Sequence, residues 1–325
     1  MKRVFSGIQP SGEAHLGNYA GAIANWVRLQ DKYECIYCVV DYHAITQPYE
    51  VGELSTRTLD MACSVLAAGV DPERSTLFVQ SQVPEHTELA WLFNCVTPLG
   101  ELERMTQFKD KSRQNRKNIT AGLLDYPVLQ AADILLYKAE GVPVGEDQVQ
   151  HLELTREIAR RFNSRYGDVF PEPAPLLSKA KKILGLDGQA KMSKSVGNTL
   201  RMLADSGEIW DKLRPAVTDT NRVRRDDPGD PEICNLFTIH ETFTPEEKRG
   251  EIAAGCRDAS IGCFDCKKIL AEHIDATMAP IRERYAQFRE NPEQVRQILQ
   301  AGAEHSRKIA REVINEARDA MGLMR

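Results

Sequence analysis

The sequence predicts an α/β fold followed by a helical region, and three observations indicate this. Apolar runs of strand length alternate with segments of helical periodicity through the first half of the chain. Prolines cluster between Pro171 and Pro175, and from residue 201 to Arg325 the periodicity is almost wholly helical. Alternating strands and helices are typical of βαβ units that build a parallel sheet. We therefore expect an α/β domain at residues 1–175, a loop region at 176–200 and a helical domain at 201–325.

The expected strands are short apolar runs. The run at residues 35–40 is unbroken, as in a central strand that is covered on both faces. Cys35 and Cys38 of this strand should point to opposite faces, so they are not expected to share a metal ion. The other two strand candidates are residues 4–8 and 76–79.

The expected helices carry apolar residues at helical spacing. Gly69 suits the position just after one helix, and Pro280 and Pro292 suit helix starts. Cys63 and Cys95 fall in helical patterns and are expected in the core. The predicted helices of the first half cover residues 16–27, 54–68 and 147–162.

The composition is that of an ordinary globular protein. The chain has 325 residues, of which 42% are apolar and 27% are charged. Its formal net charge of −5 argues against a general nucleic-acid binder, so contact with RNA would need local patches. No apolar run is long enough to span a bilayer, and the first residues lack the apolar core of a signal peptide. We expect a cytoplasmic protein with no membrane partner, whose eight cysteines are reduced or metal-bound.

A Gly/Pro/Ser loop at residues 7–12 is the first candidate phosphate site. His15, Leu16, Gly17 and Asn18 follow it, where the first strand ends and the first helix begins. The free N–H groups of a helix N-terminus suit a phosphate, and glycines let the backbone approach it closely. His15 and Asn18 add side-chain donors. The alternative is a loop that only caps the helix.

A second motif, Lys191-Met192-Ser193-Lys194-Ser195, lies between two glycines in the segment 185–197. Two lysines and two hydroxyl groups on a loop suit a pyrophosphate that must be held and then released. The alternative is a solvated basic turn.

Together, and in this order, the two motifs resemble the "HIGH" and "KMSKS" signatures of class I aminoacyl-tRNA synthetases. Leu16 and Asn18 replace the isoleucine and the second histidine of the first signature, and tryptophan-specific members commonly differ at the second of these positions. Further segments are similar to bacterial tryptophanyl-tRNA synthetases, and the resemblance runs in order from residue 3 to about residue 220. These segments are residues 5–12, 41–46, 100–107, 126–137 and 144–148.

The resemblance implies a Rossmann-like, doubly wound parallel sheet that binds the nucleotide, followed by a helical domain that binds the tRNA anticodon. It implies ATP-dependent activation of L-tryptophan, with Mg²⁺ accompanying the ATP, and transfer to tRNA(Trp) by a cytoplasmic homodimer. The residues implied in catalysis are His15, Asn18, Lys111, Lys191 and Lys194. Those implied in ATP binding are Gln9, Ser11, Gly17, Asn18, Asp147, Lys191, Ser193 and Lys194.

The side chain of tryptophan has one polar group, the indole N–H, so its pocket needs apolar walls and one acceptor. By resemblance that acceptor is Asp133, beside Ile134 at the start of an apolar helix segment. An unpartnered buried carboxylate is costly, so the pocket should reject phenylalanine, which offers no donor. The alternative is that Asp133 caps the helix that it opens. Gln130 stands where bacterial relatives commonly have methionine. The other residues implied are Phe5, Gly7, His43, Tyr126, Val142, Val144 and Gln148, with Tyr126 and Gln148 at the amino group.

A basic run could approach the acceptor stem of tRNA. It consists of Lys109, Lys111, Arg113, Arg116 and Lys117. A solvated helix face is the alternative for its outer residues.

Four cysteines near the C-terminus have the spacing C-x₂₁-C-x₆-C-x₂-C: Cys234, Cys256, Cys263 and Cys266. Four thiolates in a cytosolic protein suit an iron–sulfur cluster or a structural zinc ion. Zinc sites usually pair two short Cys-x₂-Cys segments, and this region has one. A subset of tryptophanyl-tRNA synthetases carries a [4Fe–4S] cluster on a closely similar pattern, so the resemblance favours that cluster. Zinc and unliganded thiols are the alternatives.

Other functions remain open. A tyrosyl-tRNA synthetase would share the architecture and would also recognise a polar group with an aspartate, but residues 7–12 and 145–148 favour tryptophan. A different nucleotidyl transferase would keep the phosphate motifs without needing the helical domain. A catalytically silent relative that only binds RNA would not need both Lys191 and Lys194.

Overall fold

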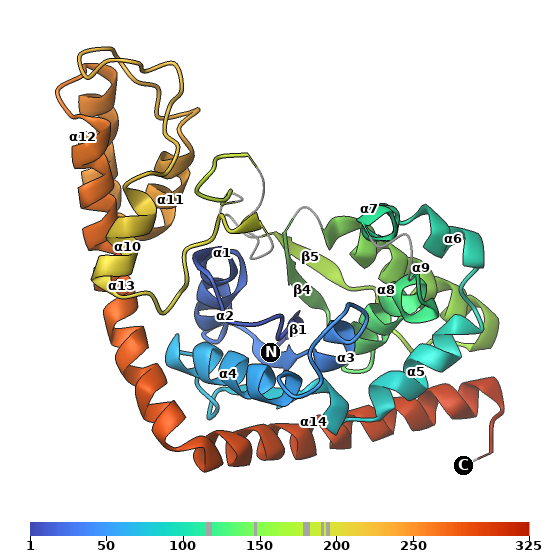
Figure 1. Ribbon diagram of the computed structural model, residues 1–325. Coiled ribbons are helices and arrows are strands. Elements are labelled where there is room, and N and C mark those ends of the chain that lie inside the picture. The colour runs from blue at the N-terminus through green and yellow to red at the C-terminus, as the bar shows by residue number, and fades with distance from the viewer. Residues whose placement is uncertain (115–118, 146–147, 178–182, 190–191, 193–195, 325) are drawn as a thin grey trace.

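The computed structural model describes residues 1–114, 119–145, 148–177, 183–189, 192 and 196–324. The predicted site residues Asp147, Lys191, Ser193 and Lys194 lie outside this part of the chain. Figure 1 shows a sheet surrounded by helices, with a helical arm that rises on one side of it. Within the described ranges, no helix is long and apolar enough to cross a membrane.

Among the described residues, five parallel strands form one sheet in the order β3-β2-β1-β4-β5. The chain builds from β1 through β2 to β3 and then crosses back to β4 and β5, so the order reverses between β1 and β4. This doubly wound arrangement confirms the predicted α/β fold. The strands are β1 Arg3–Ile8, β2 Glu34–Val39, β3 Ser75–Val79, β4 Gly141–Val144 and β5 Ala174–Leu177.

The three strands predicted from the sequence are confirmed, whereas β4 and β5 were missed. Each of the missed strands has four residues and contains a proline, Pro143 or Pro175, so neither shows an apolar run of strand length. Strand β5 falls partly in the segment that was predicted to be a loop. Cys35 and Cys38 pack into two different apolar clusters, which shows that they lie on opposite faces of the sheet, as predicted.

The predicted helices of the first half are also confirmed, with small shifts at their ends. Gly69 follows α4 with a backbone φ of +113°, a conformation that favours glycine. Cys63 is buried in α4 as predicted, but Cys95 is exposed just after α5, so its predicted place in the core is wrong. The helices are α1 Leu16–Asn18, the π-helical η1 Tyr19–Ile23, α2 Ala24–Leu29, α3 Asp41–Ala44, α4 Leu54–Ala67, the 3₁₀ turn η2 Gln80–Gln82, α5 Glu85–Asn94, α6 Leu99–Arg104, α7 Thr106–Gln114, α8 Ala121–Leu135 and α9 Val149–Tyr166.

Asp133 lies near the C-terminal end of α8, not at its start. Thr120 caps the N-terminus of this helix instead, since its side chain accepts a hydrogen bond from the backbone N–H of Leu123. The interpretation of Asp133 as a helix cap is therefore wrong. Pro127 lies inside α8, and an internal proline conceals the helical turns on either side of it in the sequence.

The last part of the chain is helical, as predicted. Pro292 is the first residue of α14, but Pro280 lies inside α13, so the helix start predicted there is wrong. Buried apolar residues on both sides of that proline, Ile274 and Ile281 among them, hold one continuous helix against the core. The helices are α10 Ser206–Leu213, α11 Asn235–Phe243, α12 Glu246–Arg257, α13 Cys263–Glu290 and α14 Pro292–Met321.

Helices α10, α11, α12 and the first half of α13 form the arm, while α14 runs back beneath the sheet domain (Figure 1). Along this path α14 contacts β3, α5 and α4. At the contact with the edge strand β3, a Cβ atom on Gly302 would stand 2.0 Å from the carbonyl oxygen of Leu77. The close approach lets α14 cover a sheet edge that would otherwise expose unpaired backbone groups.

Candidate active site at the carboxyl end of the sheet

The predicted tryptophan-binding residues come from segments that meet at one edge of the sheet. Gly7 lies near the end of β1, Val144 ends β4, and His43 lies in α3, directly after β2. Because β1 pairs in parallel with both β2 and β4, these carboxyl ends share an edge. The strand order reverses between β1 and β4, which is where doubly wound sheets bind their ligands.

The carboxylate of Asp133 is buried at this edge and is surrounded by donors; 1% of the residue is exposed. Its Oδ1 accepts hydrogen bonds from Gln80 Nε2 at 2.6 Å and from His86 Nδ1 at 2.7 Å. Its Oδ2 lies 2.6 Å from His43 Nε2. Burial by itself would raise the pKa of this carboxyl, but His43 and then His86 hold the pKa well below its usual range. Asp133 is therefore an ionised acceptor at neutral pH.

The sequence analysis missed Gln80 and His86. Gln80 follows β3 directly, in η2, and His86 lies in the first turn of α5; both are fully buried. The nitrogen of His86 that faces away from Asp133, Nε2, lies 2.7 Å from the hydroxyl of Tyr137. The cost of burying a carboxylate was the signal available in the sequence, because it requires donors from neighbouring elements.

The predicted walls of the pocket are largely apolar and buried. The ring of Phe5 stacks on that of Tyr137, with 5.4 Å between the ring centroids. At Gly7 a Cβ atom would stand 2.8 Å from Cγ1 of Val40, so a side chain there would displace its neighbour. Gln130 is half-buried. The remaining predicted wall residues, Ile134, Val142 and Val144, are buried.

Tyr126 lies in a second polar cluster. Its hydroxyl is 3.0 Å from His151 Nε2 and donates to Gln107 Oε1 at 3.3 Å, and the Nζ atom of Lys111 stands 4.4 Å from the centre of its ring. Burial raises the pKa of Tyr126 to about 12 and lowers that of Lys111. Gln148 immediately precedes α9, the helix that carries His151. The structure thus brings Lys111, predicted for phosphate, against Tyr126, predicted for the amino group.

The first phosphate motif forms the predicted junction between strand and helix. Gln9 is half-buried and Ser11 is exposed in the loop after β1, and His15 is the residue before α1. The side-chain oxygen of Asn18 accepts a hydrogen bond from the backbone N–H of His15 at 3.0 Å. Gly17 lies against the ring of His15, where a Cβ atom would stand 2.9 Å from Nδ1.

The described part of the second motif packs on the first. Met192 is buried, and its Cβ would be 3.5 Å from a Cβ atom placed on Gly17. Directly after the motif, the backbone N–H of Leu16 donates to the carbonyl of Leu200 at 2.9 Å, and that of Met202 donates to the carbonyl of Ala14 at 2.8 Å. Two segments almost two hundred residues apart therefore pack against each other.

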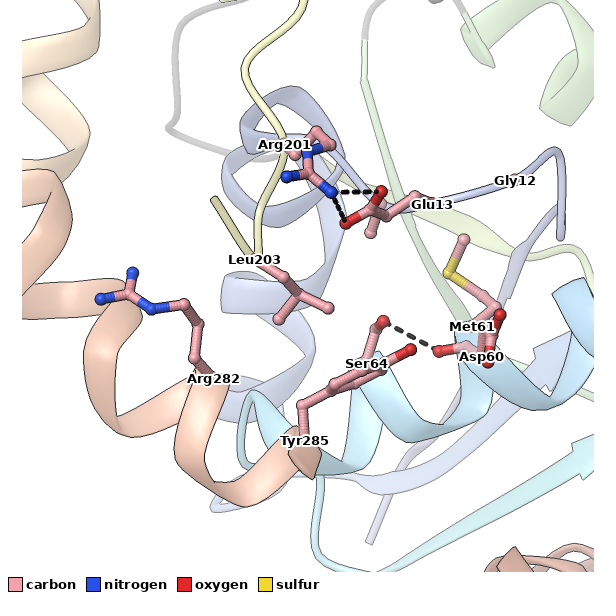
Figure 2. Close-up of a pocket in the computed structure, with 10 residues that line it drawn as sticks. Gly12, Glu13, Asp60, Met61, Ser64, Arg201, Leu203, Arg282 and Tyr285 are labelled. Atoms are coloured by element: carbon pink, nitrogen blue, oxygen red, sulfur yellow. Dashed lines mark hydrogen bonds and ion pairs between the residues drawn. The ribbon is translucent and has the colours of Figure 1, made fainter. Parts of the chain in front are cut away.

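Arg201 reinforces this junction with ion pairs. Its Nη1 lies 3.2 Å from Glu13 Oε2, and its Nε donates to Glu208 Oε1 of α10 at 2.7 Å. Figure 2 shows Arg201 and Glu13 beside a cavity of about 430 Å³ that also touches α4 and α13. No residue that was individually predicted to bind ATP or tryptophan lines this cavity, but Gly12, the last residue of the first candidate phosphate loop, does. Its lining is Gly12, Glu13, Ala14, Asp60, Met61, Ser64, Arg201, Leu203, Arg282 and Tyr285.

The four cysteines predicted to bind metal lie together in the arm. Cys234 precedes α11, Cys256 is in α12, and Cys263 and Cys266 are in the first turn of α13. Burial first, and then the charges of the other three thiols, raise the pKa of Cys266 to about 12, so all four lie within electrostatic range. In the part of the chain that the structure describes, however, no three His, Cys, Asp or Glu side chains are arranged to hold a metal ion.

Known proteins of similar sequence identify the family of this chain. The family model for class I tRNA synthetases of the tryptophan and tyrosine type matches residues 1–279. A tryptophan–tRNA ligase of Deinococcus radiodurans is 54% identical over 330 residues, which cover 100% of both chains. A tryptophan–tRNA ligase of Thermotoga maritima is 48% identical over 327 residues, which cover 99% of each chain.

The fold gives the same result. A crystal structure of tryptophanyl-tRNA synthetase from Campylobacter jejuni, complexed with ADP and tryptophan, superposes with a TM-score of 0.86 at 37% identity. The superposition covers 99% of this chain and 100% of that one. The chain therefore belongs to the class I tRNA synthetases of the tryptophan and tyrosine family.

Proposed function

We propose that this chain is a ligase that joins L-tryptophan to tRNA(Trp). It is an aminoacyl-tRNA synthetase: it activates tryptophan with ATP and transfers the activated amino acid to tRNA. The observation that carries the choice of tryptophan over tyrosine is the 54% identity to a tryptophan–tRNA ligase over 100% of both chains, because an aspartate could bind a polar group of either amino acid. In the proposed pocket that aspartate is Asp133, an ionised acceptor buried among apolar residues where the strand order reverses. Identity to tryptophan–tRNA ligases over the full length of the chain supports the same assignment.

In the proposed pocket the indole N–H donates a hydrogen bond to Asp133, while Phe5, Val142 and Val144 contact the ring. Phenylalanine would leave the carboxylate without its ligand donor. Sites that hydrogen-bond a substrate group reject analogues that lack it by about 10⁴- to 10⁵-fold. Tyr126 and Gln148 contact the amino group of tryptophan. The other proposed wall residues are Gly7, His43, Gln130 and Ile134.

The reaction proceeds in two steps. The carboxylate of tryptophan attacks the α-phosphorus of Mg·ATP, the bond to the β-phosphate breaks, and pyrophosphate leaves with its charge. The 2′-hydroxyl of the terminal adenosine of tRNA then attacks the carbonyl carbon of the adenylate, and AMP leaves. No covalent bond to the protein forms, so the protein contributes positioning and charge stabilisation.

The phosphate residues act at the junction of the two motifs. His15, Gly17 and Asn18 hold the phosphates from the end of the helix, and the packing of Met192 on Gly17 supports their placement beside the second motif. Lys111 is a further phosphate ligand. Mg²⁺ arrives with the ATP and is held by phosphate oxygens and water. The remaining proposed ATP ligands are Gln9, Ser11, Asp147, Lys191, Ser193 and Lys194, with Asp147 at the ribose hydroxyls and the two lysines at the leaving pyrophosphate.

Residues 201–325 are the proposed anticodon-binding domain. The way in which the arm stands out from the sheet domain in Figure 1 supports contact with a part of the tRNA remote from the active site. The proposed contact with the acceptor stem is the basic run between residues 109 and 117. Lys109, Lys111 and Arg113 of this run lie in α7, whereas Arg116 and Lys117 lie outside the described residues. The proposed assembly is a homodimer in the cytoplasm.

An iron–sulfur cluster on Cys234, Cys256, Cys263 and Cys266 is a separate proposal. The electrostatic influence of the other three thiols on Cys266 supports it. Protein purified without oxygen should contain iron and acid-labile sulfide and absorb visible light, and Cys266→Ser should lose all three. Cys95→Ser, at an exposed cysteine away from the arm, is the control. Wild-type protein without iron would refute the proposal.

Charging of tRNA tests the proposed function directly. The chain, incubated with radiolabelled tryptophan, ATP and tRNA(Trp), should form aminoacyl-tRNA, and labelled tyrosine or phenylalanine should form none. Charging with tyrosine instead would assign the chain to the tyrosine branch of the family. Failure to charge with any of the three, in folded protein, would favour a silent RNA-binding protein.

A further inference from the structure

We propose that His86 and Gln80 are positioning residues for tryptophan recognition: together they occupy one oxygen of Asp133 and so reserve the other for the indole N–H. The inference rests on the proposed function, in which this carboxylate binds the indole. Neither side chain has to contact tryptophan, because both act through Asp133.

The two carboxylate oxygens of Asp133 are not equivalent. Oδ1 accepts from Gln80 Nε2 at 2.6 Å and from His86 Nδ1 at 2.7 Å. A carboxylate oxygen has two lone pairs, so these two donors fill Oδ1. Oδ2 accepts from His43 Nε2 at 2.6 Å, and among the described residues no second donor reaches it. The oxygen with room for a ligand donor is therefore Oδ2.

The proton of His86 is directed toward Asp133 by a partner on the other side of its ring. An ionised carboxylate can only accept, so Nδ1 must carry a proton. In the neutral ring Nε2 is then the acceptor for the hydroxyl of Tyr137, 2.7 Å away. Tyr137 is itself fully buried and stacks on Phe5, which fixes its position. The orientation of the carboxylate is thus set by a chain of groups that starts in the core.

The amide of Gln80 gives independent support. Its Nε2 donates to Asp133, while its Oε1 is buried and has no hydrogen-bond partner among the described residues. An unsatisfied buried acceptor is costly, so its presence here needs a compensating interaction at the other end of the amide. The opposite orientation of the amide would set Oε1 against the carboxylate, so two acceptors would face each other. Gln80 therefore directs its Nε2 donor to Asp133, and its Oε1 atom is left without a hydrogen bond among the described residues.

Removing the donor of His86 should weaken recognition of the indole without touching the phosphates. In His86→Leu the Oδ1 atom loses one donor, and Asp133 is free to turn or to take up a proton. We expect KM for tryptophan to rise by about tenfold or more, as for the loss of one hydrogen bond to a charged group, with kcat nearly unchanged. The preference for tryptophan over an isostere with sulfur in place of the indole N–H should fall by a similar factor.

Two variants separate positioning from simple loss of structure. His86→Asn keeps an N–H donor close to the Nδ1 position, so it should restore most of the selectivity. Phe78→Leu is the matched control: Phe78 is fully buried and its ring lies 5.8 Å from that of His86, but it makes no hydrogen bond to Asp133. This control should lower the melting temperature and leave the selectivity as in the wild type.

The experiment is ATP–pyrophosphate exchange by the full chain with L-tryptophan and with β-(3-benzothienyl)-L-alanine, normalised to titrated active sites. We expect His86→Leu to lose selectivity for tryptophan, His86→Asn to recover most of it, and Phe78→Leu to keep the wild-type selectivity. Wild-type selectivity in His86→Leu, or an equal loss in Phe78→Leu, would overturn the inference. If His86→Leu does not fold, Gln80→Leu tests the same oxygen and should show the same loss. Wild-type protein that gives no exchange with tryptophan would instead refute the proposed function.

Discussion

Replacing Asp133 by asparagine tests how the pocket identifies tryptophan. The amide has one oxygen and one NH₂ group where the carboxylate has two oxygens. With its oxygen in the Oδ1 position, the amide still accepts from Gln80 and His86, and only His43 must change its tautomer to accept from the new NH₂ group. The reverse orientation would require both Gln80 and His86 to change. The NH₂ group should therefore occupy the position that faces the ligand.

The magnitude follows from this geometry. The three protein contacts of Asp133 survive as neutral hydrogen bonds, so Asp133→Asn should lose only about 1–2 kcal/mol of folding stability. The indole N–H, in contrast, loses a charge-assisted bond and meets another donor. The two effects together should cost about 3 kcal/mol or more in the transition state, which is about a hundredfold in kcat/KM for tryptophan.

The assay is steady-state exchange of ATP and pyrophosphate with tryptophan and with phenylalanine. Activity with tryptophan should fall by the factor given above, mainly through KM, while the very low activity with phenylalanine should change little, because that substrate has no N–H group. Wild-type kcat/KM for tryptophan in Asp133→Asn, with the preference over phenylalanine intact, would refute the role of this residue.

Other predictions follow from the same structure. Gly302→Ala should lower the free energy of unfolding in urea by about 2 kcal/mol or more, because its Cβ would meet the carbonyl of Leu77. The control Gly250→Ala, which has open space around it in α12, should be neutral or stabilising by up to about 1 kcal/mol. Equal effects of the two substitutions would contradict the packing of α14 on β3. The folded pKa of Asp133 lies below its ordinary value of 3.8, so the stability that its ionised form contributes is fully present above that pH and is lost as pH falls below it. The free energy of unfolding, measured from pH 5 down to pH 2, should therefore be higher for the wild type than for Asp133→Asn by an amount that shrinks in acid. A difference that stays constant over this range would contradict the lowered pKa of Asp133. Lys194→Ala should slow adenylate formation in single-turnover measurements far more than it weakens tryptophan binding; equal losses would argue against a role confined to the transition state.

Local sequence pattern predicted three of the five described strands, whereas the candidate tryptophan-binding residues came from the resemblance. Residues 35–40 could be assigned because a strand buried on both faces is apolar throughout, and Cys35 and Cys38 were correctly placed on opposite faces for the same reason. Strands β4 and β5 could not be assigned, because four residues that include a proline carry too little periodicity. Strand β4 is defined by its pairing with β1 and strand β5 by its pairing with β4, and pairing is not visible in a local pattern.

In the candidate site, too, single residues could be identified from the sequence, whereas the contacts that depend on the fold could not. Asp133 was identified by resemblance, and the cost of burying a carboxylate in an apolar segment supported that choice, but the partners of Asp133 could not be identified from the sequence. Gln80, His86 and His43 come from η2, α5 and α3, and their convergence depends on the strand order. The incorrect placement of Asp133 at a helix start has a local cause, since Pro127 interrupts the helical pattern of α8 without ending the helix.

The chain is proposed to activate tryptophan and to select it through one buried acceptor, Asp133. The most direct measurement is ATP–pyrophosphate exchange by the wild-type chain with tryptophan, tyrosine and phenylalanine tested separately. We predict that exchange depends on tryptophan and that the rates with tyrosine and with phenylalanine are lower by several orders of magnitude. Comparable exchange with tyrosine or phenylalanine, or none with tryptophan in folded protein, would contradict the account.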